Sequence, residues 1–391
     1  MSPSRVMVCF GTRPEVIKLA PVIQCLERDA RLEVKTVTTA QHREMLQQML
    51  ETFAIDPDVD LDLMRPGQDL AALTSRAVAA LGETIVELKP DAVLVQGDTT
   101  TAFSAALAAF YAQVPVAHVE AGLRTGDVQR PFPEEMNRRL LTRLADWHFC
   151  PTQDSARNLE KEGVSLTTIE VTGNTVVDAL QTIVHRLADG SASAGVPPKR
   201  ARHRVLVTLH RRETQGTQQR RLCRMLARVA CRGDVEVVFP VHLSPAVRRS
   251  VQAELGGHQS VHLLPPVDYV SFVQLMRTSD LVVTDSGGVQ EEAPSFGVPV
   301  VVMRDTTDRP EGVRAGCAVL AGTDPSRVSF HINRLLDDPQ VRSRASQNPY
   351  GDGRAAERIA DRIALELVGD DSSRTRRFRR PDEAVPVEIP A

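Results

Sequence analysis

The chain has no long hydrophobic run and no excess of charge of either sign. Its 391 residues are 42% apolar and 25% charged, with a formal net charge of −3. No apolar stretch approaches the roughly 20 residues that cross a bilayer, and the balanced charge gives no global basic field for nucleic acid. Residues 1–5 show no signal-peptide pattern before the first strand-like segment. We therefore expect neither a membrane nor a nucleic acid as a partner.

Closely spaced cysteine pairs are also absent. The six cysteines are scattered along the chain: Cys9, Cys25, Cys150, Cys223, Cys231 and Cys317. This spacing disfavours a metal cluster and is typical of reduced, mostly buried thiols. The interpretation that follows is a cytoplasmic protein without disulfides.

What the chain does contain is a regular alternation of short apolar runs and longer amphipathic stretches. Strands are predicted at 5–10, 33–38, 92–95, 114–119 and 168–171, and then at 204–208, 235–240, 261–264, 281–284 and 298–302. Helices are predicted at 14–28, 41–53, 69–88, 99–111, 133–145, 218–230, 245–255, 269–278, 289–296, 325–336 and 354–367. This rhythm is typical of an α/β fold built from βα units on parallel sheets.

A stretch rich in Gly, Ser, Ala and Pro at 189–203 interrupts the rhythm and is predicted to be a linker. The chain then divides into a Rossmann-like domain at 1–188 and a second one at 204–353, with a central cleft between them. The helix at 354–368 is expected to pack back on the first domain. The mixed basic and acidic tail at 369–391 is expected to be disordered, and a solvated end is favoured over contact with an anionic partner.

The clearest candidate for a ligand site is the stretch from Asp285 to Glu292, which reads DSGGVQEE. It follows the apolar run at 281–284 and opens a predicted helix. Small residues at such a turn leave backbone N–H groups open at a helix N-terminus, which suits a phosphate. Glutamates one to two turns later could hold a ribose. The alternative is an ordinary turn with a Ser or Asp cap, because short glycine motifs are not specific.

The end of the first predicted strand carries a second group of polar residues. Gly11 permits close approach of a backbone, and Pro14 suits the first turn of the next helix. Arg13 and Lys18 are placed to face a diphosphate. The alternative, a solvated helix start, is weakened because two cations near a helix N-terminus are unfavourable without an anion.

Carboxylates follow two further strands, at the strand ends where open α/β sheets bind ligands. Asp98 could be the N-cap of the next helix, which is the more common role. Glu120 ends a buried apolar strand, where a carboxylate needs a partner or a function. Glu134 and Glu135 open a later helix, which the helix dipole alone would favour; the alternative is that one of them points into the cleft.

Two histidines follow neighbouring strands of the second half. His210 lies after the strand at 204–208, and His242 lies after the strand at 235–240. A lone histidine is usually structural. Two of them at adjacent strand ends, beside the DSGG turn, favour a functional role.

Taken together, these segments resemble the non-hydrolysing UDP-N-acetylglucosamine 2-epimerase family. The resemblance runs over residues 5–367, and it rests on FGTRPEVIK, TAQHREML, GDTTT, HVEAGLRTGD, PEEMNRR, TGNTVVDAL, HRRET, PVHLSP, TDSGGVQEEAPSFGVPVVVMRDTTDRPEGV and NPYGDG. No single segment would suffice, but their order and spacing do. The resemblance implies a glycosyltransferase-B-like fold, a nucleotide held mainly by the second domain, and a homodimer.

The resemblance also implies roles for individual residues. The positions that match contacts with UDP or the sugar are Arg13, Lys18, Phe272 beside the uracil, Ser286, Gly287, Gly288, Glu292 on the ribose hydroxyls, and Arg309. The positions that match the family's catalytic set are Asp98, Glu120, Glu134 and His210. Its substrates would be UDP-N-acetylglucosamine and UDP-N-acetylmannosamine.

These residue types suit that reaction. The C2 proton of the sugar is not next to a carbonyl, so departure of UDP from C1 must first acidify it. Amides of the DSGG turn, with Arg13 and His210, would stabilise charge on the diphosphate. A carboxylate would then take the proton, and each acid–base step contributes on the order of 10²–10⁴ in rate. Asp98 is favoured as the base for the gluco sugar, with Glu134 or Glu120 on the opposite face. No cofactor or metal is predicted.

The sequence departs from the family pattern at several positions. Leu209 stands where a glycine is common, residues 214–216 also differ, and Val267 replaces a glutamine near the uracil. In bacterial members a second UDP-N-acetylglucosamine can bind beside the substrate as an activator. Four residues match parts of that site: Gln41, His42, Arg211 and His242. Because Leu209 would adjoin this site, activation is left open.

Three rival functions share the same predicted fold or site. A retaining glycosyltransferase would need an acceptor groove and no carboxylates on both sugar faces. A hydrolysing epimerase would release free N-acetylmannosamine. A non-catalytic UDP-sugar sensor would bind without turnover, and the intact set of Asp98, Glu120, Glu134 and His210 disfavours it.

Overall fold

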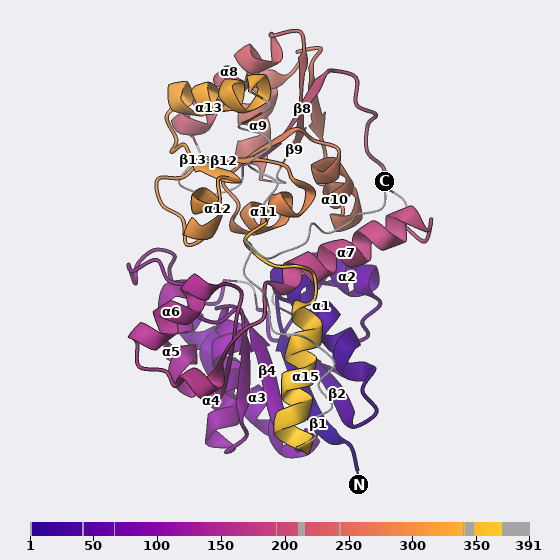
Figure 1. The fold of residues 1–391 in the computed structure, drawn as a ribbon, viewed down its shortest axis with the longest axis vertical. Helices are drawn as coiled ribbons and strands as arrows, with labels where there is room; N and C mark the ends of the chain where they lie inside the picture. The colour runs from indigo at the N-terminus through magenta and orange to yellow at the C-terminus, as the bar shows by residue number, and fades with distance from the viewer. Residues whose placement is uncertain are drawn as a thin grey trace. The chain divides into compact units, whose positions relative to one another are not determined.

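The structure is a computed structural model that describes residues 2–40, 43–65, 67–192, 194–209, 216–241, 244–338, 340 and 348–369. Internal contacts divide the chain into two compact units. The first unit comprises Met1–Ala179 with Tyr350–Ala391, and the second comprises Leu180–Pro349. Each unit contains one parallel sheet with helices on both faces (Figure 1).

The first sheet has seven strands in the order β3-β2-β1-β4-β5-β6-β7. All neighbouring strands are parallel. The strands are β1 (Ser4–Phe10), β2 (Leu32–Thr38), β3 (Val59–Asp60), β4 (Ala92–Gln96), β5 (Val116–Val119), β6 (Trp147–Cys150) and β7 (Ile169–Val171). Because β4 lies beside β1, the order reverses there, and open α/β sheets bind ligands at such switch points.

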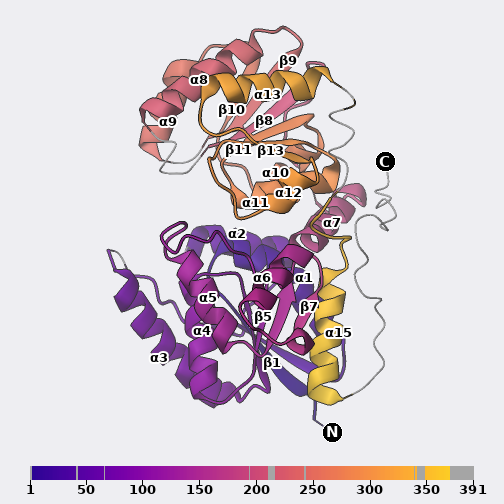
Figure 2. The same ribbon diagram turned by 60° about the vertical axis from the view of Figure 1, so that its left-hand side comes forward.

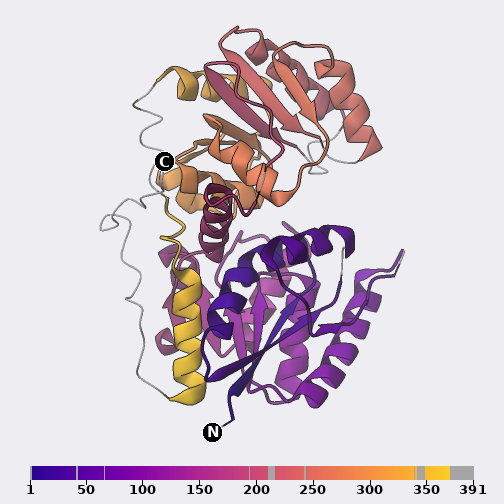
Figure 3. The same ribbon diagram turned by 90° about the vertical axis from the view of Figure 1, so that its right-hand side faces the viewer.

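Helices of the first unit cover both faces of this sheet. They are α1 (Arg13–Glu27), α2 (Arg43–Phe53), α3 (Leu70–Leu88), α4 (Thr100–Tyr111), α5 (Glu134–Leu144), α6 (Gln153–Lys161) and α15 (Ala355–Val368), with a 3₁₀ turn η1 (Leu166–Thr168). The helix α7 (Thr175–Ala188) begins in the first unit and continues past its limit at Ala179. The helices α3, α4 and α5 pack side by side, as Figure 2 shows. The helix α15 packs on α1, and the two lie together in Figures 1 and 3.

The core of the first unit explains this arrangement. Residues of β4 are buried on both faces, as expected for a central parallel strand. Small side chains on α4, including Ala102, Ala105 and Ala109, are fully buried against the sheet. Alanines lose little side-chain entropy in a helix and let its backbone approach the sheet closely. The helix α4, and with it the turn after β4, is therefore held firmly on the sheet.

The second sheet has six parallel strands in the order β10-β9-β8-β11-β12-β13. They are β8 (His203–Thr208), β9 (Val235–Pro240), β10 (Val261–Leu264), β11 (Leu281–Thr284), β12 (Val300–Val302) and β13 (Ala318–Leu320). The helices are α8 (Thr217–Ala230), α9 (Pro245–Leu255), α10 (Tyr269–Arg277), α11 (Gly287–Glu292), α12 (Pro310–Arg314) and α13 (Pro325–Asp337), with a 3₁₀ turn η3 (Ala293–Phe296). The helices α8, α9 and α13 share one hydrophobic core with the sheet.

The α/β class and the two parallel sheets confirm the sequence prediction, whereas several details differ. Strands β3, β6 and β13 were not predicted. The helix expected at 289–296 is a short α11 followed by the 3₁₀ turn η3, in which Pro294 stands near the start and cannot donate a helical hydrogen bond. The contacts divide the chain at Ala179 and Pro349, earlier than the predicted limits at 188 and 353.

The predicted linker at 189–203 is partly attached to the second unit. Lys199 pairs with Asp280 at 2.6 Å, and the backbone N–H of Arg200 donates to Glu236 at 3.0 Å. Arg204, buried at the start of β8, donates to the carbonyl of Pro197 at 2.9 Å. The second half of this stretch is therefore an ordered edge of the second unit.

The C-terminal helix α15 is fastened to the first unit by hydrogen bonds from its first eight residues. The N–H of Ala356 donates to Asp178 at 2.8 Å, and Arg358 donates to the carbonyl of Thr172 at 2.9 Å. Arg362 donates to the carbonyl of Thr167 at 3.1 Å. The predicted tail lies outside the described residues, apart from Gly369. Among the described helices, none combines the length and apolarity needed to span a membrane.

Candidate active site

The carboxyl edge of the first sheet brings together the predicted carboxylates Asp98 and Glu120. Asp98 follows β4 and Glu120 follows β5, and these strands pair with Gln96 opposite Val119. The backbone N–H of Gly97 donates to the carbonyl of Val119 at 3.0 Å, which ties the two strand ends together. The two carboxylates therefore lie on adjacent turns of one sheet edge.

Glu120 is held by two side chains from other elements. Lys18 of α1 donates to its Oε1 at 2.5 Å, and Gln96 at the end of β4 donates to its Oε2. All three side chains are buried. The backbone φ of Glu120 is +66°, a conformation that is strained for a non-glycine residue and is often found at functional sites. Glu120 is thus a fixed carboxylate whose charge is compensated by Lys18.

Asp98 is held differently, from the helix α5. Arg138 donates to its Oδ2, and the side-chain amide of Asn137 donates to its backbone carbonyl at 2.9 Å. The side chain of Asp98 is 24% exposed, and its Oδ1 accepts no hydrogen bond within the described residues. The N-cap of α4 is Thr99, whose hydroxyl accepts from the N–H of Ala102. The alternative interpretation of Asp98 as a helix cap is therefore wrong.

The two glutamates at the start of α5 have different environments. Glu135 is fully buried; it accepts from the N–H of Thr125 at 3.0 Å and pairs with Arg139 at 3.1 Å, so it fastens the preceding loop to the helix. Glu134 is half-buried and lies four residues before Arg138, on the same face of α5. Glu135 contacts the Arg138–Asp98 pair, since its Oε2 lies 3.5 Å from Nη1 of Arg138.

The turn after β1 is organised by Glu15, a residue that the motif analysis passed over. Its carboxylate accepts from the N–H groups of Gly11 at 2.9 Å and Thr12 at 2.7 Å, and from the hydroxyl of Thr99 at 2.6 Å. Burial raises the pKa of Glu15, although these hydrogen bonds oppose the rise. Glu15 thereby joins the first βα turn to the turn that follows Asp98. Arg13 lies exposed at the start of α1.

Gly11 is required by close packing at this edge. A Cβ atom there would collide with the hydroxyls of Thr39 and Thr101, which bond each other at 2.7 Å. The side chain missing at Gly11 therefore lets three βα turns approach one another.

The corresponding edge of the second sheet carries the DSGG turn. The N–H of Ser286 donates to the hydroxyl of Thr284 at 2.9 Å, so this amide is engaged, contrary to the expectation that all the amides of the turn are open. Gly287 and Gly288 are the first two residues of α11, where helix amides have no intrahelical acceptor. The turn thus offers two backbone donors beside a serine hydroxyl.

Arg309 lies directly over this turn. Its Nε donates to Glu291 at 2.7 Å, and its Nη1 pairs with Asp308 at 2.7 Å. A Cβ atom at Gly287 would stand 2.9 Å from Nη1 of Arg309. A glycine at this position leaves room for the guanidinium, so the position of Arg309 depends on Gly287.

Other predicted binding residues of the second unit lie in or beside its helices. Glu292 is buried in α11, and a Cβ atom at Gly288 would lie 3.8 Å from its Oε1. Phe272 is half-buried in the first turn of α10, and Val267 is half-buried just before that helix. Leu209, which stands where a glycine is common in the family, belongs to the hydrophobic core of the second unit.

Five predicted residues lie outside the described residues: Gln41, His42, His210, Arg211 and His242. The proposed leaving-group histidine and the proposed activator site therefore stay predictions. The central cleft also stays a prediction.

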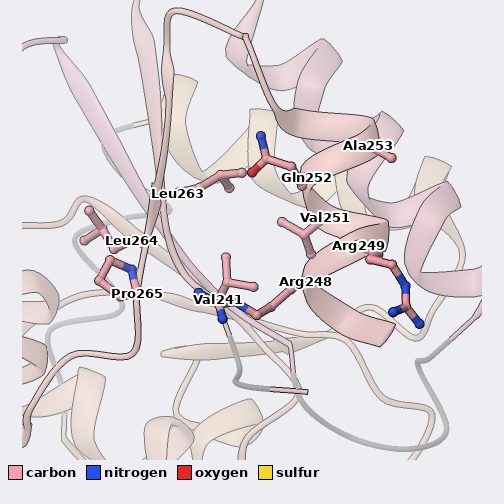
Figure 4. A pocket seen from close by; sticks show the side chains of 9 residues that line it. All are labelled: Val241, Arg248, Arg249, Val251, Gln252, Ala253, Leu263, Leu264 and Pro265. Carbon is pink, nitrogen blue, oxygen red and sulfur yellow. The ribbon is translucent and has the colours of Figure 1, made fainter. Parts of the chain in front are cut away.

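A cavity of about 650 Å³ lies elsewhere in the second unit, between α9 and β10. In Figure 4, Val241, Val251 and Leu263 point into it, and Arg248 and Pro265 stand at its border. None of the described residues that line it is a predicted site residue. Within the described ranges, no cluster of three or more His, Cys, Asp or Glu side chains is arranged to hold a metal ion.

The structure adds residues that the sequence analysis did not single out. Gln96 binds Glu120, Arg138 binds Asp98 and Glu15 binds Thr99. Glu291 and Asp308 hold Arg309. The sequence could have indicated Arg138, because it stands one helical turn after the predicted site residue Glu134. No periodicity or spacing could have paired Gln96 with Glu120, because their contact depends on the register of β4 and β5.

Comparison with known proteins shows what this chain is similar to. A sequence model of the UDP-N-acetylglucosamine 2-epimerase family matches residues 24–364. The UDP-N-acetylglucosamine 2-epimerase of Escherichia coli K12 is 48% identical over 371 aligned residues, which cover 92% of this chain and 98% of that protein. The crystal structure of UDP-GlcNAc 2-epimerase from Neisseria meningitidis bound to UDP-GlcNAc is 42% identical, with a TM-score of 0.87, and the match covers 94% of this chain and 100% of that one.

A more distant structure bears on the fold alone. The glycotransferase of kitacinnamycin is only 16% identical, but it has a TM-score of 0.64 over 94% of this chain and all of that one. The two-sheet architecture is therefore shared with glycosyltransferases, as the expectation of a glycosyltransferase-B-like fold requires. With a family model over most of its length and a relative at 48% identity, the chain belongs to the UDP-N-acetylglucosamine 2-epimerase family.

Proposed function

We propose that this chain interconverts UDP-N-acetylglucosamine and UDP-N-acetylmannosamine reversibly. The observation that carries the proposal is the placement of Asp98 and Glu120 on adjacent strand ends, each beside a cation from a different helix. Inversion at C2 needs acid–base groups that act on both faces of the sugar ring. Carboxylates fixed separately, with Glu134 on α5 as a third, supply such groups, whereas transfer to an acceptor would not require them.

In the first step, the bond between C1 and the diphosphate oxygen breaks, and its electron pair leaves with UDP. The amides of Gly287 and Gly288, the guanidinium of Arg309 and Arg13 stabilise the charge that develops on the diphosphate. The oxocarbenium-like C1 that results acidifies the C2 proton. A carboxylate takes this proton, the C2–H electrons form the C1=C2 double bond, and the products are 2-acetamidoglucal and UDP.

Asp98 is the carboxylate best suited to take the proton from the gluco sugar. Arg138 engages one of its oxygens, while the other accepts no hydrogen bond within the described part of the chain. Glu120, in contrast, has both oxygens engaged, by Lys18 and Gln96. Glu120 therefore maintains the charge and geometry of the site, and Glu134 delivers a proton to the opposite face.

In the reverse addition, UDP returns to C1 as the proton arrives at C2. Addition to the opposite face gives the manno sugar, and the same groups run the reaction backwards. Glu292 is proposed to bind the ribose hydroxyls and Phe272 to stand beside the uracil, with Ser286 and Lys18 completing the contacts to the nucleotide sugar. His210 is proposed to manage the proton at the leaving phosphate.

The test is incubation of the protein with UDP-N-acetylglucosamine alone in D₂O, followed by NMR of the nucleotide sugars. The expected result is UDP-N-acetylmannosamine with deuterium at C2, and deuterium also in the recovered substrate. Loss of UDP without C2 deuterium would point to a transferase. Free N-acetylmannosamine would indicate a hydrolysing enzyme, and binding without any change would indicate a sensor; each of these outcomes overturns the proposal.

A homodimer is proposed as the assembly. Three large apolar side chains are exposed on the adjacent helices α3 and α4: Val86 at 70%, Phe110 at 58% and Tyr111 at 69%. Apolar side chains that gather on neighbouring helices are typical of interaction sites. Light scattering should give twice the chain mass, and Tyr111→Lys should weaken the dimer. A monomer at micromolar concentration would refute this assembly.

A cytoplasmic location is proposed because the six cysteines are free and most are buried. Free thiols persist in reducing compartments. Cell fractionation with periplasmic and cytoplasmic marker enzymes tests it, and recovery with the periplasmic marker would contradict it.

A further inference from the structure

Two tripeptides at the edge of the first sheet are linked in a crossed fashion. One is Gln96-Gly97-Asp98 at the end of β4, and the other is His118-Val119-Glu120 at the end of β5. The first residue of each tripeptide contacts the other tripeptide. Gln96 donates to the carboxylate of Glu120, and Nε2 of His118 lies 2.8 Å from the carbonyl oxygen of Gly97, next to Asp98.

The two linking side chains are enclosed in protein. Gln96 is 3% exposed and His118 is fully buried. Burial lowers the pKa of His118 to about 3, so its imidazole is neutral at physiological pH. A neutral imidazole facing a carbonyl must carry its proton on that nitrogen, so Nε2–H donates to Gly97. Polar side chains buried in this way are costly unless their hydrogen bonds are used.

The backbone at both contact points needs such support. Gly97 has a φ of +70° and Glu120 has a φ of +66°. Glycine tolerates this conformation, whereas glutamate adopts it only when surrounding contacts enforce it. The link from Gln96 and the link from His118 act on these two residues.

We infer that Gln96 and His118 are positioning residues of the epimerase, each setting the carboxylate that follows the neighbouring strand. Gln96 orients the carboxylate of Glu120 together with Lys18. His118 sets the turn that carries Asp98 by fixing the carbonyl of Gly97. The inference deepens the proposed function, since it rests on the proposed roles of Asp98 and Glu120.

The first test replaces Gln96. Gln96→Met keeps a similar volume without the donor, and misplacement of a reacting group by about 1 Å can cost roughly 10²-fold in rate. We expect kcat to fall to that extent while the affinity for UDP, measured by calorimetry, changes less than about twofold.

Gln96→Glu tests the role of Gln96 through the pH dependence of kcat, which a purely structural role would leave unchanged. Beside Glu120, a protonated carboxyl can donate the same hydrogen bond, but an ionised one repels it. Glu120 contacts Gln96 and pairs with Lys18, and the Asp98–Arg138 pair follows the same strand end. We expect Gln96→Glu to outperform Gln96→Met at acid pH and to lose this advantage as pH rises.

The second test replaces His118. Glutamine can place an N–H near the position of Nε2, so His118→Gln should retain most of the kcat, whereas His118→Leu should lose about 10²-fold. His148 provides the matched control, because it stands opposite His118 in β6, is equally enclosed, and has no imidazole hydrogen bond within the described residues. His148→Leu should keep the kcat of the parent protein.

Several results would overturn the inference. It fails if Gln96→Met and His118→Leu keep their kcat, if their kcat and UDP affinity fall in parallel, or if Gln96→Glu shows the same pH profile as Gln96→Met. If Gln96→Met does not fold, the pH profile of kcat in Gln96→Glu is compared with that of the parent protein. If His118→Leu does not fold, the kcat of His118→Gln is compared with that of His148→Leu. Asp98→Asn and Glu120→Gln are measured alongside. If these two variants keep their activity, the proposed roles of Asp98 and Glu120 are refuted. If they lose activity while Gln96→Met stays active, only the positioning role is refuted.

Discussion

The carboxyl edges of the two sheets are built from the same βα units but present opposite kinds of chemistry. At the edge of the first sheet, charged side chains meet in pairs: Glu120 with Lys18, and Asp98 with Arg138. At the edge of the second sheet, the turn itself is made of Ser286 and two glycines, and its donors are mostly backbone amides. One edge suits the movement of protons and the other suits the binding of an anion.

The difference determines how each edge responds to change. A buried ion pair is costly to form, and removal of one partner leaves an uncompensated charge, with a penalty of about 3–5 kcal/mol. The first edge should therefore be sensitive to any loss of charge. The second edge depends on the absence of side chains, because Gly287 makes room for Arg309. It should be sensitive to added volume.

The largest effect is expected from Asp98→Asn, which removes the proposed base but keeps its shape. The kcat should fall by roughly 10²–10⁴-fold, the range for loss of a general acid–base group, whereas UDP should bind as before, because Asp98 is not among its proposed contacts. Asp154 is a matched control: it also pairs with an arginine, and its side chain is equally exposed at 24%. Asp154→Asn should be fully active. Unchanged turnover in Asp98→Asn would remove this residue from the mechanism.

A somewhat smaller effect is expected from Lys18→Met. Loss of the ammonium leaves Glu120 without its opposite charge, which favours the protonated carboxyl. The kcat should fall by about 10²-fold, and the acid limb of the pH–rate profile should move to higher pH. Lys35, which pairs with Asp58 on the far part of the sheet, is the control, and Lys35→Met should leave the profile in place. A profile that moves to lower pH in Lys18→Met would contradict this account of the pair.

At the other edge, Gly287→Ala should act on binding rather than on chemistry. The added methyl would stand 2.9 Å from Arg309, so the guanidinium must shift away from the diphosphate site. KM should rise roughly tenfold, equivalent to about 1.4 kcal/mol, with kcat changed less. Gly288→Ala is the internal comparison, because its methyl would meet only Glu292, at 3.8 Å. If Gly288→Ala raised KM more than Gly287→Ala, the role assigned to the Gly287–Arg309 contact would be wrong.

Much of the fold could be predicted from the sequence because its signals are local. Apolar runs in central strands such as β4 and β11 are long enough to be distinguished from helices, and caps such as Asp69 and Asp268 mark helix starts. Strand β3 has only two residues, and β6 combines Trp147 and His148 in four residues, so neither shows a clear period. These short strands form because their backbone groups make hydrogen bonds with neighbouring strands.

The residues of the candidate site could be predicted from the sequence, but the contacts between them could not. Strand ends and motif order identified Asp98, Glu120 and the DSGG turn. Which cation pairs with which carboxylate depends on distances across the fold: Lys18 and Glu120 are 102 positions apart in sequence. The engagement of the Ser286 amide by Thr284 is a matter of backbone geometry that the residue types do not determine.

The last contrast between the units concerns acid stability. The first unit buries His118 and His148 side by side, and burial lowers their pKa values to about 3 and about 4. Both imidazoles are neutral in the folded unit, while the unfolded chain protonates them near 6.5. Their contribution is therefore intact above pH 6.5 and is lost as pH falls, by about 1.4 kcal/mol per pH unit for each histidine.

The only tryptophan, Trp147, lies in β6, so its fluorescence reports unfolding of the first unit. Urea unfolding at pH 7.5 and 5.5 should show the loss of stability, and His148→Phe should make this loss smaller, since one of the two histidines whose pKa is lowered in this unit is removed. His258→Gln, in the second unit, should leave the dependence as it is. An equal dependence in His148→Phe and the parent protein would mean that the buried histidines are not what makes the first unit sensitive to acid, and the contrast would then have to rest on the carboxylate pairs.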